Sequence, residues 1–210
     1  IGYPPPMLWH RPARTALGAA IALLAATLPA CSIIAPKTNL ALTAADAPAT
    51  LTAGFTTAVF ASSDPNEANL YLTDLPLARL ADPGDSLADL GGSLLHIHVF
   101  VVPRAGSTPV DATACNAALR YAVLAQGAIG VYGGGGFLFP AGKTGAPSFG
   151  GSLAGGSLRL IRATSDFKDL LGPALLEGPV TTVRDAKTAD LLRARLDALC
   201  RQAKPTSGGR

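Results

Sequence analysis

Two histidines one residue apart are the clearest chemical signal in this sequence. His96 and His98 lie in the apolar stretch of residues 93–102, which is rich in β-branched residues and ends before Pro103, as expected of a strand. Alternate residues of a strand share a face, so both imidazoles point to the same side. Two imidazoles on one face could begin a zinc, copper or iron site.

The remaining ligands of such a site are missing from the neighbourhood. The third histidine, His10, lies in the N-terminal leader, so a metal would need carboxylates from distant loops such as Asp74, Asp82 or Asp111. The His-x-His spacing resembles that of cupins, but a cupin strand carries a Glu soon after the second His, and residues 99–103 contain none. We therefore expect structural histidines, with no metal and no other cofactor. The alternative is a metal-binding protein or metal-dependent enzyme built on His96 and His98.

Two further motifs suggest chemistry without completing it. Gly142–Thr144 reads Gly-Lys-Thr, but a phosphate-binding loop needs a glycine five residues before Gly142, where Phe137 stands, and a helix after it. The four glycines Gly133–Gly136 instead indicate a bulge, a tight turn or a close backbone approach. Ser152 and Ser157 are flanked by glycines without the Gly-x-Ser-x-Gly spacing of a nucleophile. We predict no catalytic residue.

Three carboxylates follow at loose spacing, at Asp82, Asp85 and Asp89. They lack the alternating ligands and the closing Glu of an EF-hand loop. We expect a solvated acidic loop.

The N-terminal region has the pattern of an export signal. Met7 is the expected start, followed by basic Arg11 and Arg14 and by an apolar run from Ala16 to Ala30. As a helix this run would be about 22 Å long, short of a hydrocarbon core of roughly 30 Å. The run predicts a signal peptide over residues 1–30 rather than a membrane span.

Residues Leu28–Cys31, which read Leu-Pro-Ala-Cys, resemble the lipobox of bacterial lipoproteins. The resemblance implies that Cys31 becomes the acylated first residue of the mature protein, anchored to a membrane and facing the periplasm or the cell surface. It covers the leader alone, and the exported part resembles no characterised family. Plain secretion with an incidental Cys31, or an uncleaved anchor, are the alternatives.

Only Cys115 and Cys200 follow Cys31. In an oxidising compartment they could form one disulfide, and the alternative is two buried, unpaired thiols. Neither belongs to a Cys-x-x-Cys motif, which gives no support for a zinc clamp or a redox pair.

Composition limits the remaining classes of function. The chain is 49% hydrophobic and 15% charged, which excludes general disorder. Its net charge of +3 falls to +1 when Arg11 and Arg14 are removed with the leader, and the remaining basic residues are scattered. We predict no nucleic-acid partner, because that function needs basic residues clustered on one face.

Most elements predicted from the pattern are strands. Residues 51–62 and 69–74 alternate in polarity around a turn at 64–66, and further strands are expected at 93–102, 116–125, 128–132, 137–140, 157–163 and 179–183. No helical pattern of useful length separates them, which favours antiparallel pairing. A glycine- and serine-rich loop is expected over 140–156, and one helical turn over 77–80.

The C-terminus is the helical exception. One stripe of apolar residues recurs at helical spacing, and Asp185, alone or with Thr182, offers an N-cap. The members of the stripe are Ala189, Leu192, Leu196, Leu199 and Ala203.

These elements predict an all-β protein, an antiparallel β-sandwich with one C-terminal amphipathic helix. The expected organisation is a signal peptide (1–30), a flexible tether (31–50), the sandwich (51–184), the helix packed on it (185–203) and a disordered tail (204–210). The expected function is that of a cell-envelope lipoprotein, a non-enzymatic binding or structural module whose protein or small-molecule partner the sequence does not name.

Overall fold

The computed structural model describes residues 38–46, 50–82, 84–102 and 114–206. Every described residue belongs to one compact unit, residues 34–210. Within these described ranges, no helix combines the length and apolarity needed to cross a membrane. The predicted signal peptide, the lipobox-like residues 28–31 and the proposed lipidation site Cys31 all lie outside these ranges.

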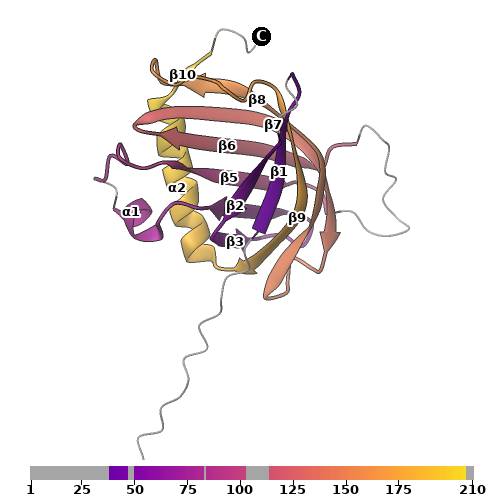
Figure 1. The fold of residues 1–210 in the computed structure, drawn as a ribbon. Coiled ribbons are helices and arrows are strands. Elements are labelled where there is room, and N and C mark those ends of the chain that lie inside the picture. The colour runs from indigo at the N-terminus through magenta and orange to yellow at the C-terminus, as the bar shows by residue number, and fades with distance from the viewer. Residues whose placement is uncertain (1–37, 47–49, 83, 103–113, 207–210) are drawn as a thin grey trace, which may run out of the picture. The chain divides into compact units, whose positions relative to one another are not determined.

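The described unit is an all-β structure, with 55% of the described residues in strands and one long C-terminal helix. Its strands form one sheet in the order β10-β8-β7-β6-β5-β4-β3-β9-β1-β2 (Figure 1). The strands are β1 (Thr38–Ala44), β2 (Thr50–Phe55), β3 (Thr57–Ala61), β4 (Ala68–Thr73), β5 (Gly92–Val99), β6 (Ala117–Ala125), β7 (Ala128–Ala141), β8 (Ser148–Ala163), β9 (Ala174–Arg184) and β10 (Lys204–Pro205), with a short helix α1 (Leu77–Ala81) between β4 and β5.

The expected two-sheet sandwich is not confirmed, and strand β9 is the reason. Along one edge β9 pairs with β8; along the other it pairs with β1 near its start and with β3 near its end. Strands β3 to β9 therefore close into a ring, from which the hairpin β1–β2 branches. The pairing of β3 with β9 is parallel, so the sheet is mixed rather than wholly antiparallel.

Each face of the sheet has its own apolar core. We call the face toward the β1–β2 hairpin the inner face and the face toward the C-terminal helix the outer face; in Figure 1 the hairpin crosses in front of the sheet and the helix lies behind it. On β5, Leu95, Ile97 and Val99 belong to the inner core and Leu94 to the outer one, so the alternation predicted from the sequence is confirmed.

The C-terminal helix α2 (Ala186–Gln202) matches its sequence prediction closely. The whole predicted stripe is buried against the outer face, and the side chain of Asp185 accepts a hydrogen bond from the N–H of Thr188 at 3.0 Å. That bond satisfies one of the N–H groups that a helix start leaves unpaired. Asp185 is therefore the N-cap.

The glycine run bends strand β7 where the ring closes on β8. The β7–β8 register shifts between Gly135 and Phe137, which confirms the expected bulge. The backbones also approach closely, because a Cβ added to Gly134 would lie 1.8 Å from the carbonyl oxygen of Ser157. Only glycine leaves room for this contact.

Several predicted boundaries differ from the structure. Residues 38–44, assigned from sequence to the tether, form β1, and the single strand expected from residue 51 is divided between β2 and β3 at Thr56. The expected loop over 140–156 is largely the first half of β8. Lys204 and Pro205, expected to be in a disordered tail, pair with β8. The helical turn predicted at 77–80 is confirmed as α1.

Candidate functional site

His96 and His98 lie together on the outer face of β5, each with a polar neighbour. The Nε2 atom of His96 is 2.9 Å from the side-chain oxygen of Asn69, and its ring stacks on Tyr71 at 4.5 Å. His98 Nε2 is 3.1 Å from a carboxylate oxygen of Glu67. Among the described residues, no group of three or more His, Cys, Asp or Glu side chains is placed to hold a metal ion.

Two of the three candidate carboxylate ligands, Asp74 and Asp82, lie elsewhere. Asp74 accepts hydrogen bonds from Ser93 at the start of β5, and Asp82 accepts one from the N–H of Gly84, while Asp111 lies outside the described residues. Neither Asp74 nor Asp82 therefore joins His96 and His98.

The pKa of His96 is lowered to about 4, first because burial disfavours the charged ring and then because Arg120 and His98 are close. Arg120 faces His96 across the β5–β6 pair and itself pairs with Asp197 of α2 at 3.2 Å. The imidazole is therefore held neutral in the folded protein at neutral pH.

This depressed pKa predicts a loss of stability in mild acid. Above a pH of about 6.5 the His96 ring is mostly neutral in both the folded and the unfolded protein. As the pH falls toward 4, the unfolded chain binds a proton at His96 while the folded chain does not, and this favours unfolding. Between pH 7 and pH 5, before carboxylates titrate, we expect the free energy of unfolding to fall by roughly 2 kcal/mol. Urea unfolding at both values measures it.

His96→Gln, which keeps a hydrogen-bonding group toward Asn69, should flatten this pH dependence. An equal loss of stability in the wild type and the variant would assign the effect to another group.

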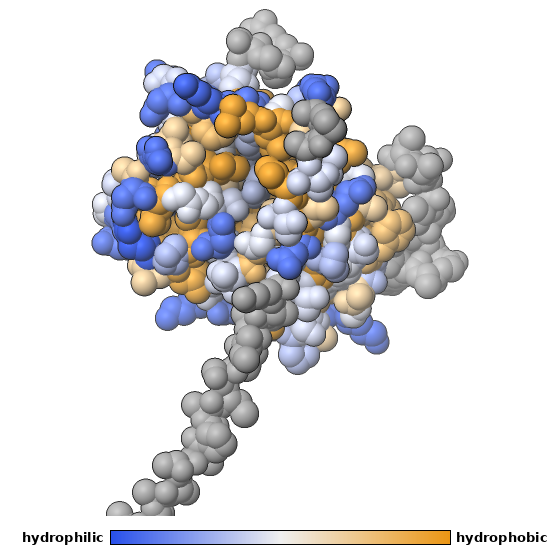
Figure 2. Space-filling model, viewed as in Figure 1, coloured by the Kyte–Doolittle hydropathy of each residue, from blue (hydrophilic) through white to orange (hydrophobic). Residues whose placement is uncertain are grey.

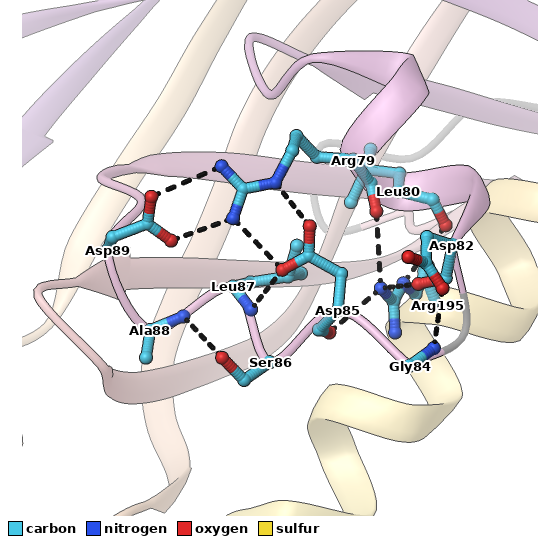
Figure 3. Close-up of polar contacts among 10 residues, drawn as sticks. All are labelled: Arg79, Leu80, Asp82, Gly84, Asp85, Ser86, Leu87, Ala88, Asp89 and Arg195. Atoms are coloured by element: carbon cyan, nitrogen blue, oxygen red, sulfur yellow. Dashed lines mark hydrogen bonds and ion pairs between the residues drawn. The ribbon is translucent and has the colours of Figure 1, made fainter.

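The acidic loop after α1 is exposed at Asp82 and Asp89 but is held to the fold by ion pairs and hydrogen bonds. The Arg79 guanidinium lies between the carboxylates of Asp85 and Asp89 and bonds to both (Figure 3). Hydrogen bonds from Arg79, and then from the N–H of Leu87, lower the pKa of Asp85 to about 2. The expected solvent exposure therefore holds for Asp82 and Asp89, whereas Asp85 is partly buried, and the ion pairs with Arg79 were not predicted because the pattern of acidic residues did not reveal their basic partner.

Arg195 of α2 binds the backbone of α1 and of the same loop. Its side chain is only 9% exposed, and its guanidinium donates to the carbonyl oxygens of Leu80, at 3.0 Å, and of Asp85, at 3.1 Å, as well as to those of Arg79 and Asp82 (Figure 3). These groups form a structural clamp between loop and helix.

Cys115 and Cys200 are free thiols in the structure. Cys115 is exposed just before β6, and its Sγ lies 3.3 Å from the carbonyl oxygen of Ala117. Cys200 is half-buried in the last turn of α2, where burial raises the pKa of its thiol. The structure thus favours unpaired thiols over a disulfide, although Cys115 is exposed rather than buried.

The strongest candidate for a binding site is a hollow between the β1–β2 hairpin and the inner face of β6. It consists of two adjoining cavities of about 260 and 250 Å³ that share Leu42, Leu51, Tyr121 and Val123. Figure 2 shows apolar residues gathered around the hairpin on this side of the molecule. We call the two parts together the hairpin hollow.

One end of the hairpin hollow is almost entirely apolar. Besides the four shared residues, this end is lined by Tyr132 and by three residues of the loop between β8 and β9, namely Phe167, Leu170 and Leu171. Two leucines at this end are open to solvent, Leu51 at 58% and Leu170 at 93% of full exposure. An apolar cavity rimmed by exposed leucines is typical of a binding surface.

The other end is polar. Asp74 Oδ1 accepts hydrogen bonds from the N–H of Ser93 at 2.6 Å and from its hydroxyl at 3.3 Å. Tyr121 lies beside both residues, and its pKa is raised, mainly because it is buried. The hairpin hollow is therefore amphipathic along its length.

Sequence reasoning missed this site because its residues come from separate elements. A strand over 116–125 was predicted, but the hairpin that faces it was assigned to the tether and to the expected first strand. The apolar residues at 167 and 170–171 lie outside any strand, which was the available signal that they serve something other than the sheet.

Comparisons with known proteins identify no relative. No protein-family model matches the chain, and neither the curated proteins nor the solved structures contain a match.

Proposed function

We propose that this protein is a non-enzymatic binding module of the bacterial cell envelope that holds an apolar ligand in the hairpin hollow. The observation that carries the proposal is the hollow itself, whose lining is aliphatic and aromatic with a few polar groups at one end. Small-molecule sites in proteins share this composition. The chemistry expected there is binding by burial of apolar surface.

The location is proposed from the leader. A lipid on Cys31 would hold the module close to a membrane, where apolar molecules concentrate. Two or more acyl chains make such attachment stable, whereas one chain binds only marginally. Mass measurement of the N-terminal peptide tests the anchor, which fails if Cys31 carries no acyl group.

The binding site can be tested by filling it. Val123 lines both parts of the hairpin hollow and is only partly buried, so Val123→Trp places an indole in open space. We expect the purified wild-type protein to bind the uncharged apolar probe N-phenyl-1-naphthylamine in equilibrium dialysis. Val123→Trp should weaken that binding at least tenfold, because the indole occupies the probe's volume.

Val101→Trp is the matched control. Val101 is exposed beyond the opposite end of β5, so the same substitution there should leave binding unchanged. Circular dichroism of both variants separates loss of the site from loss of the fold. Equal probe binding by a folded Val123→Trp variant and the wild type would contradict the proposed function.

A further inference from the structure

We propose that the ligand of the hairpin hollow is a single-chain amphiphile with a primary ammonium headgroup, which lies at Asp74 while the alkyl chain extends toward Phe167 and Leu171. This inference rests on the proposed function and names the class of ligand.

The shape of the hairpin hollow favours an elongated ligand. Each part alone falls below the roughly 300–1,000 Å³ of typical ligand sites, and only the two parts together reach that range. The shared residues lie between a polar end and an apolar end. A molecule that fills both parts must therefore be polar at one end and apolar along the rest.

The charge at the polar end selects the headgroup. Among the described residues that line this end, Asp74 is the charged one. An ionised carboxylate can only accept hydrogen bonds, and the two bonds from Ser93 both go to its Oδ1 atom. A headgroup that donates and carries positive charge would complement it, because a charge-assisted hydrogen bond is stronger than a neutral one.

The apolar end of the hairpin hollow does not select a charged headgroup. Lys168 lies on the apolar rim, but it is exposed and directly precedes Asp169. The Asp169 carboxylate accepts a hydrogen bond from the hydroxyl of Tyr132 at 2.6 Å, and further bonds from the N–H groups of Leu171 and Gly172. The apolar end therefore carries charges of both signs at its edge and favours neither an anion nor a cation.

Three probes that share one chain test the headgroup. Dodecylammonium, dodecanol and dodecanoate, each below its micelle concentration at pH 7, should displace N-phenyl-1-naphthylamine from the purified protein. We expect the ammonium compound to bind at least threefold more tightly than the other two, a modest preference because Asp74 is exposed to solvent. High salt should reduce this preference.

Asp74→Asn keeps an oxygen for Ser93 and removes the charge, so the preference for dodecylammonium should disappear while dodecanol still binds. Asp190→Asn, on the exposed side of α2, is the matched control and should retain the preference. Equal binding of all three probes by the wild type, or an unchanged preference in Asp74→Asn, would overturn this inference and leave the proposed function standing. Failure of every probe to bind the wild type would overturn both.

Discussion

Gly134→Ala is expected to lower the free energy of unfolding by about 3 kcal/mol or more, a large part of the roughly 5–15 kcal/mol that stabilises a typical protein. The added Cβ would lie 1.8 Å from the carbonyl oxygen of Ser157, and this neighbour is backbone that cannot rotate away. The β7–β8 pair would have to separate at the point where the ring of strands bends. Urea unfolding followed by circular dichroism measures the loss.

Gly145→Ala is the control, because a Cβ at that exposed position meets no atom within 4 Å. Its stability should stay within about 0.5 kcal/mol of the wild type. If both alanine variants were equally stable, the close approach of β7 to β8 would not be present in solution.

Arg195→Met should cost about 3 kcal/mol, because it removes the clamp between α2 and the loop after α1. Methionine keeps the apolar part of the side chain, so the loss reports on the hydrogen bonds. The carbonyl oxygens of Leu80 and Asp85 would lose their guanidinium partner, and an unpaired buried polar group costs roughly 1–3 kcal/mol. Thermal and urea unfolding measure the effect.

Arg193→Met, two residues earlier on the same helix, is the matched control. Arg193 is exposed and pairs with Asp190, and an ion pair of this kind contributes about 0.5 kcal/mol or less. Equal losses in the two variants would mean that the carbonyl contacts of Arg195 do not stabilise the fold. Hydrogen exchange should also show faster opening of the loop after α1 in Arg195→Met alone.

The parts of the fold that depend on local pattern were predictable from the sequence. Leu192, Leu196 and Leu199 recur at helical spacing, and Asp185 caps the helix that they define. The alternation from Leu94 to Val99 likewise predicted β5 and the shared face of its histidines. In both cases the information lies within a few neighbouring residues.

The parts that depend on distant partners were not predictable. Strand β1 alternates between buried Leu40 and Leu42 and exposed Asn39 and Ala41, but its alanines and threonines resemble a tether until β9 is placed beside it. The same long-range pairing decides between a ring and two stacked sheets. Because the hairpin hollow needs β1, β2, β6 and the β8–β9 loop together, its residues could not be grouped from sequence.

The position of β9 sets the order in which the chain can fold. The hydroxyl of Thr38, at the start of β1, bonds to the carbonyl oxygen of Thr181, 143 residues later in the chain. Strands β1, β3 and β8 all pair with β9, so the sheet can close only after residues 174–184 have been synthesised. Long-range pairing of this kind is slow to form.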